Sequence, residues 1–135
     1  MAGTRVRLLV DTHLLLWSLI DDPRLSERAR QMIADPGNEI VVSKVVLWET
    51  AVKRALTRHA PDFPFSPEQV RTELNLAGAT WLEIEDEHLF TLARLPMLHL
   101  DPFDRLFVAQ ALTEPMRLVT HDRQVAQYSD TVILV

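Results

Sequence analysis

Five carboxylates stand where segments of this sequence are predicted to join, and their type and placement suggest a common site. Asp11 closes an apolar run, Glu49 lies in the middle of a helical pattern, Asp101 and Asp104 open another helix, and Asp122 follows a second apolar run. Like charges about 4 Å apart repel by about 4 kcal/mol per pair at an effective dielectric near 20. If the five converge, they need a cation or a shifted protonation, and a hard divalent ion is the obvious neutraliser.

The elements that must position these acids alternate along the chain. Apolar runs predict strands at residues 6–10, 39–43, 80–84, 117–120 and 131–135. Helical spacing and capping residues predict helices at residues 12–20, 26–35, 44–56, 66–78, 86–95, 102–112 and 122–128, with Asp86 as a cap. Strands separated by helices predict an α/β fold, a three-layer α/β/α sandwich with a mostly parallel central sheet.

Ligands of such sheets bind at the carboxyl ends of the strands. Asp11 and Asp122 are both predicted at these ends, directly after the first strand and two residues after a later one. Asp104 joins them if its helix points its N-terminus toward the same edge. Glu49 joins them only if its helix lies across that edge.

Composition limits the class of protein. A chain of 135 residues, 47% of them hydrophobic, fits a single domain over residues 1–135 with a substantial core. The absence of Cys excludes disulfides, thiol catalysis and cysteine metal sites. The longest apolar run, residues 14–20, is too short to span a membrane, and the N-terminal pattern lacks the features of a signal peptide, so we expect a cytoplasmic protein without a membrane span.

The net charge of −5 does not by itself exclude a nucleic-acid ligand. Phosphate contacts are made mainly by Lys and Arg. Of the 14 basic residues 12 are Arg, which binds phosphate or carboxylate in bidentate fashion, and an acidic metal cluster would account for much of the negative charge. Arginine usage that reflects only genomic composition is the alternative.

Each acid also has a purely structural explanation. Asp11, Asp101 and Asp122 are good helix N-caps, and Asp104 stands in a first helical turn, where the helix dipole favours negative charge. Glu49 could be a surface residue that pairs with a lysine four positions later.

Other chemistry-bearing residues give weaker signals. The five histidines lack a paired metal spacing and are interpreted as structural or surface residues, although His13 and His121 adjoin two of the acids and could contact a substrate. The three tryptophans, including Trp48, are interpreted as core residues. Serine-hydrolase, P-loop and dinucleotide sites lack their required motifs.

Four segments, in order, resemble those of one known family. They are Leu9-Val10-Asp11-Thr12-His13 with Leu15-Leu16-Trp17, then Ser43 with Leu47-Trp48-Glu49 and Lys53, then His99-Leu100-Asp101-Pro102-Phe103-Asp104-Arg105-Leu106 with Ala109-Gln110-Ala111, and finally Leu118-Val119-Thr120-His121-Asp122. Over nearly its whole length the chain resembles PIN-domain ribonucleases, particularly the VapC-like toxins of bacterial type II toxin–antitoxin pairs.

This resemblance implies a metal-dependent endoribonuclease that hydrolyses RNA phosphodiester bonds. Asp11, Glu49, Asp104 and Asp122 would be catalytic and hold one or two Mg²⁺ or Mn²⁺ ions, and Asp101 would be a fifth acid at the metal site. Thr12 or Thr120 would hydrogen-bond beside them, and Lys53 or Arg105 could hold the RNA backbone. The implied partners are an RNA substrate, a cognate antitoxin that blocks the site and a second copy of the chain in a homodimer.

Two alternatives remain open. The chain could be a non-catalytic PIN-like module that binds RNA or protein and keeps the acids only as caps. It could also be a receiver- or phosphatase-like domain with an acidic Mg²⁺ site, in which Asp11 would be phosphorylated.

Overall fold

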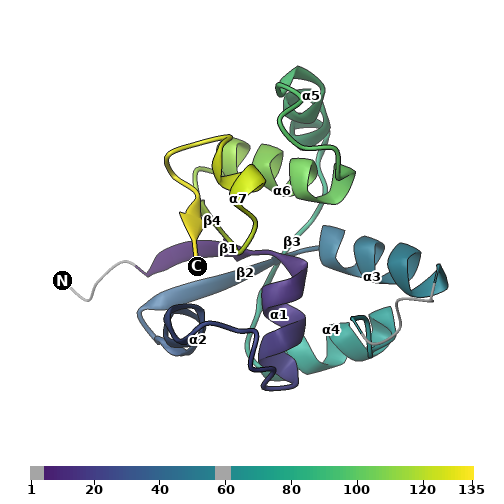
Figure 1. Ribbon diagram of the computed structural model, residues 1–135, viewed down its shortest axis with the longest axis vertical. Helices are drawn as coiled ribbons and strands as arrows, with labels where there is room; N and C mark the ends of the chain where they lie inside the picture. Colours follow the sequence, from purple (N-terminus) through teal and green to yellow (C-terminus); the bar gives the residue numbers. More distant parts are fainter. Residues whose placement is uncertain (1–4, 57–61) are drawn as a thin grey trace.

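The computed structural model describes residues 5–56 and 62–135, which form a five-stranded sheet in the order β3-β2-β1-β4-β5 (Figure 1). Every neighbouring pair of these strands is parallel. The strands are β1 (Val6–Val10), β2 (Asn38–Ser43), β3 (Thr80–Leu82), β4 (Arg117–Thr120) and β5 (Ile133–Leu134). The predicted mostly parallel sheet is therefore parallel throughout the described strands.

Helices cover both faces of this sheet. In the described residues they are α1 (Thr12–Leu19), α2 (Glu27–Ala34), α3 (Val45–Ala55), α4 (Pro67–Leu76), α5 (Asp86–Arg94), α6 (Pro102–Thr113) and α7 (Arg123–Ala126). Figure 1 shows α1, α2 and α4 on one side of the sheet, α6 and α7 on the other, and α5 stacked on α6. The predicted three-layer α/β/α sandwich is confirmed.

The central strand β1 fixes the place of the site. Its last three residues, Leu8, Leu9 and Val10, are buried, and they pair with β2 on one side and β4 on the other. Strands β2 and β3 lie in sequence order on one side of β1, and strands β4 and β5 lie in sequence order on its other side. The strand order thus reverses between β1 and β4, and a crevice opens at the carboxyl ends of strands at such a reversal.

Helix α6 brings a further part of the chain to this crevice. Pro102 occupies its first position, where a missing N–H costs nothing, and Asp101 caps it. Residues such as Phe103, Leu106 and Phe107 are buried, because α6 lies between the sheet and α5. A helix buried on several sides has little freedom to shift, so its N-terminus is held firmly at the crevice.

Local predictions differ from the structure in a few places. β3 and β5 are shorter than predicted, and α5 is capped by Glu85 rather than Asp86, because Glu85 and the buried His88 form a reciprocal capping box. Trp48 is 45% exposed, so its interpretation as a core residue is wrong, whereas Trp17 is buried as predicted. His59 lies outside the described residues. Among the described helices, none has the length and apolar character that crossing a bilayer requires.

Candidate metal centre

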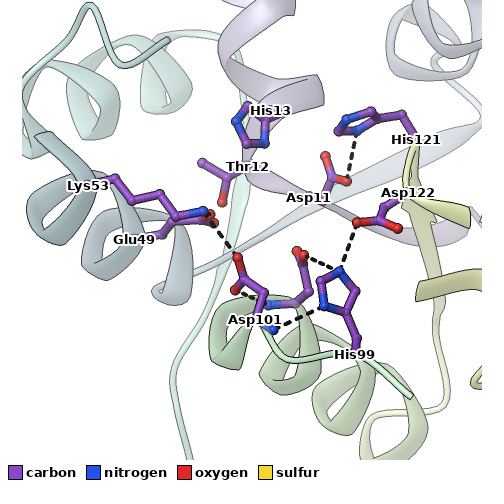
Figure 2. Close-up of a pocket in the computed structure, with 10 residues that line it drawn as sticks. Asp11, Thr12, His13, Glu49, Lys53, His99, Asp101, His121 and Asp122 are labelled. Carbon is purple, nitrogen blue, oxygen red and sulfur yellow. Dashed lines mark hydrogen bonds and ion pairs between the residues drawn. The ribbon is translucent and has the colours of Figure 1, made fainter. Parts of the chain in front are cut away.

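All five predicted carboxylates lie around one pocket at the carboxyl edge of the sheet (Figure 2). The pocket has a volume of about 180 Å³. Four parts of the chain supply its lining: the β1–α1 junction, the middle and C-terminal part of α3, the first turn of α6 with the loop before it, and the residues after β4. The lining side chains are Asp11, Thr12, His13, Glu49, Lys53, His99, Asp101, Asp104, His121 and Asp122.

Asp11 serves as a helix cap and also faces the pocket. Its Oδ1 accepts a hydrogen bond from the Leu14 N–H at 3.0 Å, which confirms the predicted cap. Its Oδ2 accepts a hydrogen bond from the Thr120 hydroxyl at 2.7 Å, which ties the end of β1 to the end of β4. A carboxylate oxygen has two lone pairs, so these bonds leave acceptor capacity on both oxygens. The structural and functional explanations of Asp11 are therefore compatible.

Glu49 reaches the pocket because α3 lies beyond the ends of the strands (Figure 1). The predicted pairing with Lys53 is present, with 2.5 Å between Lys53 Nζ and Glu49 Oε2. The alternative that Glu49 is a surface residue is wrong, because its side chain is only 2% exposed. Its other oxygen, Oε1, is buried without a hydrogen-bond partner in the described structure, and so is the Thr12 hydroxyl in the same pocket. Unpaired buried oxygens are costly, and both are free to bind a ligand.

The start of α6 presents two acids with different surroundings. Asp101 Oδ1 accepts the N–H groups of Phe103 and Asp104, so Asp101 caps the helix as predicted. Asp104 lies one turn later, and its side chain is 20% exposed. Burial, followed by the negative charges of Asp101, Glu49 and Asp11, raises the pKa of Asp104 to about 7. The raised pKa of Asp104 reflects the repulsion that the sequence predicts for converging acids.

His99 is the pocket residue that the sequence interpretation missed. Its Nε2 lies 2.9 Å from Asp122 Oδ2 and 3.3 Å from Asp104 Oδ2, so the ring bridges two acids (Figure 2). Its Nδ1 accepts the backbone N–H of Asp101 at 3.0 Å. Nδ1 therefore carries no proton, and Nε2 carries one, which it donates to Asp122 while lying in close contact with Asp104.

This tautomer decides between two roles for His99. The nitrogen of His99 and an oxygen from each of Asp104 and Asp122 lie within 4.8 Å of one another, which is compatible with a shared metal ion. A metal-binding histidine, however, normally donates a proton from its other ring nitrogen. Because that nitrogen of His99 accepts a hydrogen bond instead, we interpret His99 as a donor that positions the two acids.

The residues after β4 complete the pocket. Asp122 caps α7 through the Gln124 N–H, as predicted. Partial burial raises the pKa of Asp122, but its hydrogen bonds from His99 and Gln124 outweigh burial and place the pKa below the ordinary value. His121 Nδ1 lies 3.6 Å from Asp11 Oδ2, and this interaction raises the pKa of His121 against the effect of partial burial. His13, by contrast, has a lowered pKa because it is largely buried.

The donor set fits a hard divalent cation. Carboxylate and hydroxyl oxygens are the ligands that Mg²⁺ and Mn²⁺ prefer. Glu49 Oε1 and Thr12 Oγ1, which are buried without a hydrogen-bond partner, add two pocket oxygens that helix capping does not use. The pocket is also large enough for an ion that keeps several waters.

Comparison with known proteins agrees with this architecture. Residues 8–130 match the family model described as PIN domain. A search of curated protein sequences found no match. Among solved structures, the chain is similar to one in VapBC2 from Rickettsia felis bound to a DNA fragment from its promoter, with a TM-score of 0.65 and 17% identity over 96% of this chain and 98% of that chain.

Two further structures show the same fold. A chain of a toxin–antitoxin complex from Klebsiella pneumoniae matches with a TM-score of 0.63 and 23% identity, covering 93% of this chain and 95% of that chain. A chain of VapBC-1 from nontypeable Haemophilus influenzae matches with a TM-score of 0.60 and 16% identity, covering 96% of this chain and 97% of that chain. The sequence motifs, the parallel sheet and the family match agree: this chain belongs to the PIN domain family.

Proposed function

We propose that the protein is a metal-dependent endoribonuclease and the toxin of a type II toxin–antitoxin pair. The observation that carries the proposal is the convergence of five carboxylates on one pocket that also contains two buried, unpaired oxygen atoms. Membership of the PIN domain family supports a nuclease over a receiver- or phosphatase-like domain. The similar chains from Rickettsia felis and Klebsiella pneumoniae belong to toxin–antitoxin complexes, which supports the toxin assignment.

The residues have distinct proposed tasks. Asp11, Glu49, Asp104 and Asp122 would hold one or more Mg²⁺ or Mn²⁺ ions, with the Thr12 hydroxyl beside them. A bound divalent ion would activate water for in-line attack on a phosphodiester and offset the charge that develops on the phosphate oxygens. His99 would keep Asp104 and Asp122 in place, and the Thr120 hydroxyl would orient Asp11.

The proposal includes two protein partners. The acidic pocket suits a basic side chain from a cognate antitoxin, which would block access to the acids. We further propose that the toxin is a cytoplasmic homodimer and that a small neighbouring reading frame encodes the antitoxin.

Cleavage of a total-RNA pool by the purified, partner-free protein tests the function. We expect discrete fragments with Mg²⁺ or Mn²⁺, and none with EDTA or with the variants Asp11→Asn and Asp104→Asn. Asn caps a helix as well as Asp does, so these variants should fold. The observed capping by Asp11, Asp101 and Asp122 favours one competing function, a non-catalytic interaction module. An absence of cleavage together with an absence of metal binding in calorimetry would select that module.

A further inference from the structure

Among the described residues that line the pocket, Lys53 alone carries a permanent positive charge. It follows Glu49 by one turn of α3, and its side chain is 26% exposed. Its Nζ lies 2.5 Å from Glu49 Oε2 and 3.2 Å from Asp101 Oδ2 (Figure 2). The ammonium group thus bridges a carboxylate on α3 and the carboxylate that caps α6.

The lysine is enclosed as well as paired. The ring of Phe103 lies 5.5 Å from Nζ and the ring of Phe63 lies 5.9 Å from it, both within the range of cation–π attraction. Two carboxylates and two aromatic rings thus hold the ammonium in the pocket.

Lys53 separates Asp101 from the other acids of the pocket. Both oxygens of Asp101 are engaged, Oδ1 by two backbone N–H groups and Oδ2 by Lys53. Glu49 gives one oxygen to Lys53 and keeps the other, Oε1, buried and unpaired. A cation on the Asp101 side would have to share the oxygens that Lys53 contacts, and the nearby ammonium would repel it.

We propose that Lys53 takes the place of a second divalent cation, so that the pocket binds a single ion, on the side of Glu49 Oε1, Asp11 and Asp104. Asp101 is then the anchor of this lysine and not a metal ligand. The inference rests on the proposed function only in assuming that the pocket binds a divalent ion. It goes further by assigning Lys53 to the carboxylates and not to the RNA backbone.

The number of Mn²⁺ ions bound per chain tests the proposal. Native mass spectrometry and calorimetry would compare the wild type with Lys53→Met, which keeps the length of the side chain and removes its charge. The sequence contains only two lysines, so Lys44→Met is the matched control; Lys44 lies outside the pocket, 3.7 Å from Glu83. We expect one ion in the wild type and in Lys44→Met, and two in Lys53→Met, where electron paramagnetic resonance should show a spin-coupled pair.

The outcomes separate the inference from the function on which it rests. Two ions in the wild type, or one ion in Lys53→Met, would overturn the role of Lys53 and leave the proposed nuclease intact. No ion in the wild type would overturn the proposed function itself.

A labelling experiment on the wild type covers the case in which Lys53→Met does not fold. Amine acetylation, read out by mass spectrometry, distinguishes the two lysines. We expect saturating Mn²⁺ to leave the ratio of Lys53 to Lys44 labelling unchanged, because the ion does not displace the ammonium. A several-fold increase in that ratio would show displacement and overturn the proposal.

Discussion

Replacing Asp104 by Asn should stabilise the metal-free protein at neutral and alkaline pH, although Asp104 belongs to the proposed active site. Burial and three neighbouring acids raise the pKa of its carboxyl from an ordinary 3.8 to about 7. Well below pH 3.8 the carboxyl is protonated in both the folded and the unfolded chain, so it does not lower the free energy of unfolding. As the pH rises to 7, the unfolded chain releases the proton and the folded chain retains it, so the free energy of unfolding falls.

The magnitude follows from the two pKa values. At 1.36 kcal/mol per pH unit, the rise from 3.8 to about 7 corresponds to about 4 kcal/mol of lost stability, fully developed above pH 7. Asn removes the charge but still buries a polar group, so we expect Asp104→Asn to recover about 2–4 kcal/mol at pH 8. Below pH 4 the variant should be as stable as the wild type or up to about 2 kcal/mol less stable, because the amide is still buried.

Urea denaturation in EDTA at several pH values between 4 and 8 is the assay. The wild type should lose stability relative to Asp104→Asn as the pH rises, and the gap should level off above pH 7. Asp130→Asn, at an exposed turn, is the control and should follow the wild type throughout. A variant that is less stable than the wild type at pH 8, or a gap that does not change with pH, would refute the argument that the acids are clustered.

Three other perturbations have definite expected outcomes. Mn²⁺ at 100 times its dissociation constant should add about 2.7 kcal/mol to the free energy of unfolding of the wild type, and little to that of Glu49→Gln, in urea titrations. His99→Ala should weaken Mn²⁺ binding about 10- to 100-fold in calorimetry, and the wild-type Mn²⁺ complex should show no directly bound nitrogen in pulsed electron paramagnetic resonance. Phe107→Ala, in the core of α6, should cost about 3–5 kcal/mol in urea.

Sequence patterns predicted the acids that follow parallel strands. Asp11 comes directly after a short apolar run and Asp122 two residues after another. Parallel strands end at a common edge, so their approach follows from topology alone. Asp104 was reached by the same reasoning, because the N-terminus of α6 faces that edge. These three placements needed no knowledge of side-chain packing.

The remaining features depend on how helices pack, which local patterns do not encode. Helical spacing alone could not show whether Glu49 faces water or the pocket, since the exposed Trp48 beside it also fits the apolar pattern. The bridge made by His99 requires the loop before α6 to lie against the end of β4, a contact between residues 23 positions apart. The sequence shows that His99 precedes the helix cap Asp101 by two residues. The role of His99 follows only from the structure, in which the Asp101 N–H donates a hydrogen bond to His99 Nδ1.

Anomalous X-ray scattering from crystals soaked in Mn²⁺ would show whether the converging carboxylates form the metal centre of a nuclease. We expect a strong anomalous peak in the pocket, within coordination distance of Glu49 Oε1, Asp11 and Asp104, and its loss in Asp104→Asn. A pocket without a peak at saturating Mn²⁺, or a peak that persists unchanged in Asp104→Asn, would show that the carboxylates are not a metal centre.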